Sequence, residues 1–304
     1  MNQKSHSNDL TASRLPGWSP VGLGCVTFGR EIDRPAAFAM MDHAVSHGVT
    51  AFDTASAYGA GASESLVGEW LASRSCRDRV MLATKLLPPY SPSAIEGSIA
   101  ASLGRLKVST VDVIYVHRWD STVADPAVMR ALDALVHDGR VRMIGASNFN
   151  AEQLERTVGL QSELGTVRFK VLQNLQNLAV RRIDETIRQF CSRWGIAIVT
   201  YSPLGAGFLT GKHEQGVEAG SRFAIIPGHQ DVYFNELARR RLARLKEIAA
   251  RAGVSPIHLA LAWAFHQSQI ATVLVGGRTP AHLDQALRAQ AFDAPELFRE
   301  LDSE

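Results

Sequence analysis

Eight short apolar or β-branched runs recur along the chain, and segments with helical spacing lie between them. Most of the runs are almost continuously hydrophobic, which is typical of parallel strands buried on both faces. Eight strand–helix alternations in 304 residues predict an α/β fold, a (β/α)8 TIM barrel. The predicted strands are Val21–Gly24, Val49–Asp53, Val80–Thr84, Val111–His117, Val141–Ala146, Phe169–Gln173, Ala197–Tyr201 and Ala271–Val275.

The helical segments carry start and stop residues that agree with this reading. The helical spacing that follows Pro35 ends at Gly48, and Ser255 and Pro256 fit the N-cap and first position of another helix. A doubly wound open sheet is the rival fold, but it usually has a glycine-rich phosphate loop after its first strand. Residues 22–27, GLGCVT, lack the third glycine of that loop.

The length of the chain suits one barrel, which folds as a single unit. We expect residues 15–304 to form this single domain, with an additional C-terminal helix, and the polar residues 1–14 to form a flexible tail. One connection is unusually long. Residues 202–235 separate the seventh strand from the next long helix and contain many glycines, which favours a functional or a mobile loop.

Composition excludes several classes of function. The net charge of +2 gives no electrostatic case for a nucleic-acid partner, and no apolar run is long enough to predict a membrane span. The polar N-terminus lacks the apolar core of a signal peptide. Cys25, Cys76 and Cys191 are scattered without metal-ligand spacing, so we expect no metal and a reducing, cytoplasmic location.

Polar residues end three successive predicted strands at equal spacing: Asp53, Lys85 and His117. Tyr58 follows Asp53 on the same connection. Taken singly, these residues fit ordinary structural roles: a helix cap, a packed aromatic ring, an exposed lysine and a structural histidine. Taken together they predict a catalytic group, because active sites of such barrels lie at the carboxyl ends of the strands.

Their chemistry suits carbonyl reduction, which needs a proton for the oxygen atom. A phenol with a pKa of about 10 is a poor acid at neutral pH. The Lys85 ammonium would lower the pKa of Tyr58, and Asp53 would keep Lys85 charged. His117 would hydrogen-bond the substrate oxygen.

Several longer motifs resemble the aldo-keto reductase family. Residues 52–59, FDTASAYG, with Glu64 soon after, are similar to its FDTAxxYG…SE signature. The resemblance runs from about Val21 to Leu287 and implies the barrel fold, with Asp53, Tyr58, Lys85 and His117 as the catalytic tetrad. The other matching segments are ATK at 83–85, DVIYVH at 112–117, IGASNF at 144–149 and YSPLGAGFLTGK at 201–212.

The resemblance also implies a nicotinamide cofactor. Ser147, Asn148 and Gln173 match residues that hold the carboxamide, and Tyr201 matches the aromatic residue that stacks on the ring. The remaining cofactor-binding positions implied by the resemblance are Thr27, Ser202, Leu204, Gly205, Gly207, Lys212, Arg222, Gly276, Arg278, His282 and Gln285. The glycines would let backbone N–H groups approach the pyrophosphate, and the cations would add charge.

The end of the last strand resembles the family's site for the 2′-phosphate of NADP. A helix N-terminus favours an anion there, and Arg278 would add charge-assisted hydrogen bonds. NAD remains open, because Ala286 stands where the family has a side chain that contacts the adenosine. Residues 176–177, Gln-Asn, likewise replace an aromatic–serine pair of many relatives.

The predicted function is NADP-dependent reduction of an aldehyde or ketone, sugar-like compounds included, to the alcohol, with Tyr58 as general acid. Phe28 and Trp119 are expected to line an apolar substrate mouth, although Trp119 suits plain packing equally well. Two other functions stay open: a regulatory barrel subunit that binds the cofactor with little turnover, and a Schiff-base aldolase that uses Lys85. The sequence leaves monomer and homo-oligomer undecided.

Overall fold

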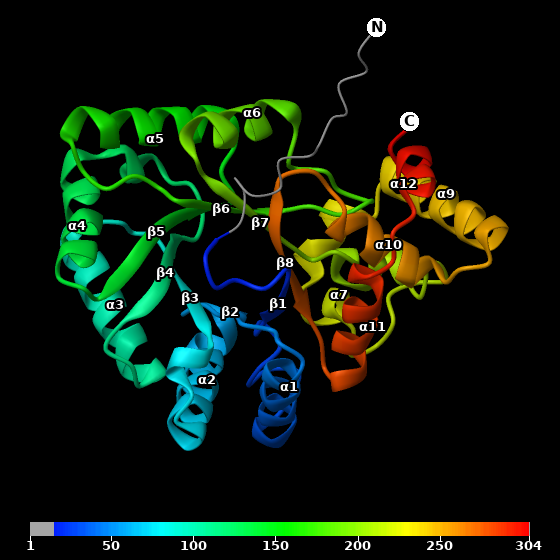
Figure 1. Cartoon of the computed structure of the whole chain (residues 1–304), viewed down its shortest axis with the longest axis horizontal. Helices are drawn as coiled ribbons and strands as arrows, with labels where there is room; N and C mark the ends of the chain where they lie inside the picture. The colour runs from blue at the N-terminus through cyan, green and yellow to red at the C-terminus, as the bar shows by residue number, and fades with distance from the viewer. Residues whose placement is uncertain (1–14, 304) are drawn as a thin grey trace, which may run out of the picture.

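The eight strands form one closed parallel barrel in sequence order (Figure 1). This is a computed structural model, and it describes residues 15–303. The predicted (β/α)8 barrel is confirmed, and the predicted tail at residues 1–14 lies outside the described residues. The strands are β1 (Val21–Gly24), β2 (Ala51–Asp53), β3 (Met81–Leu86), β4 (Val111–Val116), β5 (Val141–Ser147), β6 (Val171–Leu175), β7 (Ala197–Tyr201) and β8 (Ile270–Gly276).

Helices surround the barrel, with α5 and α6 on one side of it and α1 and α2 on the opposite side (Figure 1). Many begin at a side chain that accepts a backbone N–H; Asp33, Asn150 and Asp184 cap their helices in this way. The main helices are α1 (Arg34–Ser46), α2 (Ala62–Arg74), α3 (Pro92–Leu106), α4 (Pro126–His137), α5 (Ala151–Leu164), α6 (Glu185–Trp194), α9 (Glu236–Ala252), α10 (Pro256–Phe265), α11 (Pro280–Gln290) and α12 (Pro295–Asp302).

Some boundaries differ from the sequence prediction. Strand β3 continues two residues past Thr84, so Lys85 lies inside a strand and not beyond its end. Strand β6 begins at Val171, two residues later than predicted. Ser255 is the N-cap of α10, as expected, but its side chain makes no capping hydrogen bond there.

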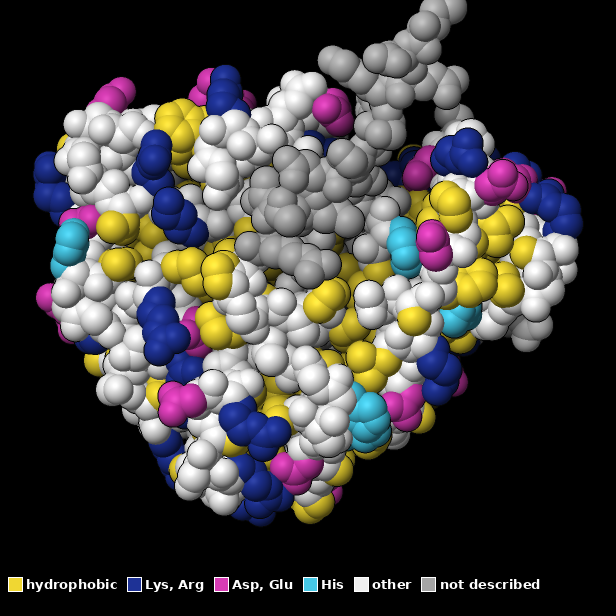
Figure 2. All heavy atoms as spheres, in the orientation of Figure 1, with side chains coloured by type: hydrophobic (Ala, Val, Ile, Leu, Met, Phe, Trp, Pro, Cys, Tyr) yellow, Lys and Arg dark blue, Asp and Glu magenta, His cyan; other side chains and the backbone are white. Residues whose placement is uncertain are grey.

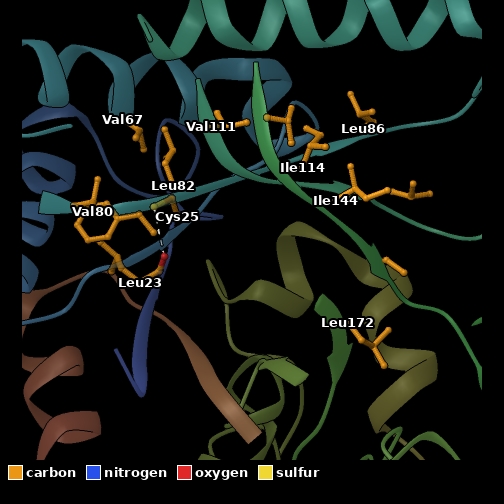
Figure 3. Close-up of a cluster of buried hydrophobic side chains, with 14 of the residues drawn as sticks. Leu23, Cys25, Val67, Val80, Leu82, Leu86, Val111, Ile114, Ile144 and Leu172 are labelled. Atoms are coloured by element: carbon orange, nitrogen blue, oxygen red, sulfur yellow. Dashed lines mark hydrogen bonds between the residues drawn. The ribbon is translucent and has the colours of Figure 1, made fainter. Parts of the chain in front are cut away.

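Apolar side chains form two layers, one outside the ring of strands and one inside it. The outer layer packs strand residues against the helices: Figure 3 shows Leu23, Leu82 and Ile144 from different strands in one cluster with Val67 of α2. The inner layer fills the barrel. Gly22 leaves room for this layer, because a Cβ atom at that position would lie 2.7 Å from a methyl carbon of Leu274.

The inner layer determines where the polar residues point. Side chains along a strand alternate between two faces, so a residue two positions after an interior residue also faces the interior. Each polar residue at the mouth follows an apolar interior residue by two positions. The pairs are Ala51 and Asp53, Ala83 and Lys85, Tyr115 and His117, Val171 and Gln173, and Val199 and Tyr201.

Short helices make up about half of the long connection after β7. They are η4 (Gly205–Thr210), α7 (Arg222–Ile225), η5 (Pro227–His229) and α8 (Gln230–Tyr233). Buried aromatic side chains hold it in place: the ring of Tyr233 lies 5.9 Å from that of Phe208 and 5.7 Å from that of Phe223. These rings belong to a core shared with α9 and α10, which explains why so glycine-rich a segment is ordered.

Within residues 15–303, no single helix is both long and apolar enough to cross a membrane; α9 and α10 meet that test only as a pair bent by 104°. The three cysteines are free thiols, and all three are buried.

Candidate active site

Four polar side chains meet at the carboxyl ends of neighbouring strands. Asp53 ends β2, Lys85 lies near the end of β3, and His117 directly follows β4. Tyr58 begins the short helix η1 (Tyr58–Gly61), which leaves β2. The structure therefore brings together the four residues that the sequence singled out.

The ammonium group of Lys85 is the centre of this group. Its Nζ atom donates to Oδ1 of Asp53, to the carbonyl oxygen of Thr54 at 2.9 Å and to the hydroxyl oxygen of Tyr58 at 3.2 Å. An ammonium has three donors, so each N–H of Lys85 has an acceptor. Its side chain is only 1% exposed, and such a buried charge is tolerated because it is paired and hydrogen-bonded.

Gln173 completes the surroundings of Asp53. Its Nε2 atom donates to Oδ2 of Asp53 at 2.8 Å, so each carboxylate oxygen has a partner. The sequence predicted Gln173 only as a contact to the cofactor carboxamide. Its link to Asp53 is a positioning role that the resemblance did not suggest.

The electrostatics of the site differ in one respect from the expectation. Burial lowers the pKa of Lys85, but Asp53 and Tyr58 more than offset this, so the net pKa is raised and Lys85 stays charged. Burial raises the pKa of Tyr58, and Lys85 opposes that rise only in part. The predicted lowering of the Tyr58 pKa is therefore wrong in its net sign, because loss of water outweighs the adjacent charge.

His117 lies beside Tyr58, with ring centroids 6.1 Å apart and the rings nearly perpendicular. Burial, with the charges of Lys85 and Arg118, lowers the pKa of His117 to about 3, so the imidazole is neutral at physiological pH. Its Nδ1 atom is buried and has no hydrogen-bond partner among the residues described. A neutral imidazole offers one N–H donor to an oxygen at the mouth.

Glu64, the last residue of the first motif, is hydrogen-bonded to β3 through Thr84. It is fully buried; Oε1 accepts from Oγ1 of Thr84 at 2.5 Å, and Oε2 accepts from Nε of Arg105 at 2.7 Å. Thr84 immediately precedes Lys85. Glu64 thus fixes the strand that carries the ammonium group.

The expected carboxamide contacts lie on the next strands. Asn148 has a positive φ of 61° directly after β5, and its Nδ2 atom donates to the backbone oxygen of His117 at 3.0 Å and to Oγ of Ser147 at 3.1 Å. The hydroxyl of Tyr201 donates to Oδ1 of Asn148 at 2.6 Å. These residues form a continuous polar surface next to the tetrad.

The connection after Tyr201 contains several residues with a left-handed backbone conformation. Ser202, Gly205 and Gly207 all have positive φ, and a Cβ atom on Gly205 would lie 2.8 Å from the ring of Tyr233. The oxygen of Leu204 accepts from the N–H of Gly207 at 3.1 Å. The two glycines let a ligand approach the backbone closely, while their own N–H groups donate within the turn.

A cluster of basic side chains faces this loop from β8 and α11. The guanidinium of Arg278 donates to the backbone oxygen of Gly220 at 2.8 Å. The backbone N–H of Arg278 donates to Nδ1 of His282 at 3.2 Å. Burial, together with the charges of Arg278 and Lys212, lowers the pKa of His282. Lys212 pairs with Glu218 at 2.8 Å.

Other expected cofactor contacts border this cluster. Thr27 Oγ1 donates to the backbone oxygen of Gly277 at 2.9 Å, which joins the connection after β1 to the end of β8 next to Gly276. Gln285 is partly buried on α11, whereas Ala286 is fully buried in the core. Ala286 therefore offers no side-chain contact to a ligand at this surface.

Arg222 is engaged differently from the expectation. Its guanidinium pairs with Glu31 at 2.8 Å, and both side chains are largely buried. This ion pair joins the connection after β1 to the connection after β7. The carboxylate of Glu31 already balances the charge of Arg222. A bound anion would therefore share the guanidinium of Arg222 with Glu31.

The two expected substrate residues have different surroundings. Phe28 is fully buried and is part of the core, so the expectation that it lines the mouth is corrected: its side chain has no exposed surface. Trp119 is partly buried, and its ring meets that of Phe149 edge-on at 5.3 Å.

A cavity of about 600 Å³ lies beside Tyr201 and Asn148 and contains residues that the sequence did not single out. Arg182, before α6, and His229, in the connection after β7, line it together with Asn150 and Gln153. They come from segments far apart in the chain, and no motif includes Arg182 or His229, so only the folded structure reveals them.

The pair at 176–177 is hydrogen-bonded to segments that border this cavity. Asn177 donates to the backbone oxygen of Ser202 at 2.9 Å and to the hydroxyl of Tyr233 at 3.3 Å. Oε1 of Gln176 accepts the N–H of Ile183 at 3.1 Å. Asn177 thus connects the segment after β6 to the connection after β7, while Gln176 holds the segment after β6 together.

A closed (β/α)8 barrel with this buried lysine–aspartate pair, tyrosine and histidine at one mouth defines an oxidoreductase barrel. The sequence matches the model of the Aldo/keto reductase family over residues 20–299. The chain therefore belongs to the aldo-keto reductase family, as its motifs led us to expect.

Relatives in fungi carry reductase names. The chain is 33% identical over 287 residues to norsolorinic acid reductase B of Aspergillus parasiticus, which covers 87% of this chain and 75% of that relative. It is 29% identical to norsolorinic acid reductase B of Dothistroma septosporum, over 92% of this chain and 76% of the relative. It is 28% identical to aldo-keto reductase ausK of Aspergillus calidoustus, over 89% of this chain and 74% of the relative. Family and relatives together support carbonyl reduction as the activity.

Proposed function

We propose that this protein is an NADP-dependent reductase that converts an aldehyde or ketone to the alcohol, with Tyr58 as the general acid. The observation that carries the proposal is the bridging position of Lys85, whose Nζ atom donates to both Asp53 and Tyr58. This geometry places a charged donor against the phenol oxygen from which a proton would leave.

In this proposal Tyr58 is protonated before reaction and transfers its proton to the substrate oxygen as negative charge develops there. Lys85 stabilises the phenolate that remains, because its pKa is raised and it stays charged. His117 is neutral and orients the carbonyl oxygen by donating a hydrogen bond. Asp53 and Gln173 hold Lys85 in position.

The residues at the mouth fit a nicotinamide dinucleotide. Polar groups on Ser147, Asn148 and Gln173 would hold the carboxamide, and Tyr201 would stack on the ring. The turn at Gly205 and Gly207 and the Lys212 ammonium would hold the pyrophosphate. Bound NADPH would supply the hydride that reduces the carbonyl carbon.

A preference for NADP over NAD rests on the Arg278 cation at the beginning of α11, with the neutral imidazole of His282 beside it. Arg278 and His282 stand at the beginning of that helix, where free N–H groups and the helix dipole favour an anion. Arg278 would form charge-assisted hydrogen bonds with a 2′-phosphate. Gln285 would contact the adenosine.

The two alternatives have less support. A Schiff-base mechanism needs a neutral amine on Lys85, but Asp53 keeps that group protonated. A regulatory subunit without turnover would not need a complete proton-donor system, whereas here each N–H of Lys85 has an acceptor.

For the substrate, we propose a polar carbonyl compound larger than a simple aldehyde. Trp119 would border the mouth, and Arg182 and His229 would contact polar or acidic substituents that reach the cavity beside Tyr201. The free cysteines fit a reducing compartment, and we propose the cytoplasm.

The test is NADPH oxidation by the purified protein against aldehydes, keto sugars and quinones, repeated with NADH. The proposal expects turnover of at least one carbonyl class, with higher kcat/KM when NADPH is the donor. Tight binding of NADPH with no turnover across the panel would favour the regulatory alternative. A lysine adduct trapped on Lys85 with borohydride would favour the aldolase alternative.

A further inference from the structure

A second group of ligating side chains lies away from the tetrad, between α1 and α11. We propose that His43, His47 and Asp284 bind one divalent metal ion of the zinc class on this surface. One potential ligand atom from each residue lies within 4.8 Å of the other two. Figure 2 shows histidine side chains beside acidic side chains on this face, where α1 and α11 lie next to each other.

The two histidines are four residues apart at the end of α1. That spacing places side chains on one face of a helix, one above the other. Their ring centroids are 4.1 Å apart, so both imidazoles point to the same side. Two imidazoles in this arrangement can bind a single ion.

The hydrogen bond of His47 to the backbone leaves its other ring nitrogen, Nε2, without a hydrogen-bond partner among the described residues. Its Nδ1 atom lies 2.9 Å from the backbone oxygen of His43, and a carbonyl can only accept, so Nδ1 carries the hydrogen. In the neutral ring, Nε2 then presents a lone pair. Metal-ligating histidines commonly donate their other N–H to a backbone carbonyl in this way.

The third ligand comes from the neighbouring helix. Oδ1 of Asp284, on α11, lies 2.6 Å from Nε2 of His43. Ligand atoms bonded to zinc at about 2.0–2.1 Å in a tetrahedron lie about 3.3 Å apart. Small side-chain rotations would open the His43–Asp284 contact and close the remaining distances, and the partial exposure of both side chains permits them.

The donor set selects the class of ion. Two imidazole nitrogens and one carboxylate oxygen, with water in the fourth position, suit Zn²⁺ and related transition metals. Mg²⁺ and Ca²⁺ prefer sites made entirely of oxygen. Bound zinc would join α1 to α11 and so stabilise the folded barrel. This inference does not depend on the proposed reductase activity.

The experiment titrates the full-length, metal-free protein with Zn²⁺ by calorimetry and with Co²⁺ by visible absorption. The variants are His47→Ala and Asp284→Ala, whose side chains are exposed or partly exposed, so we expect both to fold. His137→Ala is the matched control, because His137 also ends a helix beside a carboxylate, Asp133 at 3.5 Å, but has no second histidine in that pair.

We expect one Zn²⁺ per chain in the wild type and in His137→Ala, with affinity lowered at least tenfold in both site variants. The melting temperature should rise with Zn²⁺ in the wild type and not in the site variants, since a ligand stabilises the state that binds it. The proposal is overturned if the wild type shows no saturable binding, or if all four proteins bind Zn²⁺ equally.

Discussion

The Nζ atom of Lys85 lies 3.2 Å from the hydroxyl oxygen of Tyr58, and the same ammonium donates to Asp53. The phenol is therefore solvated by a fixed, buried charge and not by water. Burial raises the pKa of Tyr58 more than Lys85 lowers it, so the phenol is protonated at neutral pH. Lys85 acts chiefly on the phenolate left after that proton has moved.

Breaking the buried pair between Asp53 and Lys85 should strongly reduce the stability of the fold. Replacing Asp53→Asn leaves the ammonium without its counter-charge, and loss of one partner of a buried pair costs about 3–5 kcal/mol. We expect the free energy of unfolding to fall by that amount in urea denaturation. Glu69→Gln, which breaks the exposed pair with Arg34, should change it by less than about 1 kcal/mol. If the two variants lose the same free energy of unfolding, the larger cost expected for breaking the buried pair is contradicted.

The pH dependence of reduction should show no inflection near neutrality. His117 has a pKa of about 3 and stays neutral, while the raised pKa of Tyr58 keeps the phenol protonated. Reductive kcat/KM should thus be flat between about pH 6 and pH 9 and fall as pH rises through the pKa of Tyr58. Alcohol oxidation needs the phenolate, so its rate should rise with pH. A reductive inflection at about pH 6.5 that disappears in His117→Gln would show that the imidazole titrates normally.

The basic cluster at α11 should decide the cofactor preference. We expect Arg278→Ala to weaken NADPH binding about 10- to 100-fold, since a hydrogen bond to a charged group contributes about 1.5–3 kcal/mol, and to leave NADH binding nearly unchanged. Fluorescence titration with both dinucleotides measures the difference. Arg299→Ala, on the exposed face of α12, serves as the control. A parallel loss for NADH and NADPH would argue against contact with the 2′-phosphate.

Gly205 should be required by the turn after β7. Its φ of 60° and the ring of Tyr233 at 2.8 Å from a built Cβ both oppose a side chain. Gly195 has nearly the same φ of 61° but no atom within 4 Å, so Gly195→Ala carries backbone strain alone. That strain is about 1–2 kcal/mol, and Gly205→Ala should lose clearly more, measured by thermal unfolding. The explanation fails if the two variants are equally stable.

The barrel and the positions of the tetrad could be predicted from the sequence because both depend on local patterns. Buried parallel strands are continuous apolar runs, and the polar residue at each strand end stands next to its run, as Asp53 does after β2. The predicted strand ends one residue before Lys85, although β3 includes Lys85, because the charged side chain interrupts the apolar pattern.

Contacts between distant segments could not be predicted. The hydrogen bond from Gln173 to Asp53 and the ion pair of Arg222 with Glu31 each join residues more than a hundred positions apart. The burial of Phe28 depends in the same way on the helices that surround it. Motifs identify residue types and their order, whereas the partner of each side chain is decided by packing.

The most direct test of the account is the turnover of Tyr58→Phe, which removes the proton and keeps the ring. We expect kcat for carbonyl reduction to fall by about 10²- to 10⁴-fold, the usual contribution of a general acid. The dissociation constant of NADPH, measured on the same preparation, should be little changed. A variant that reduces the same substrate at the wild-type rate would contradict the assignment of Tyr58 as the proton donor.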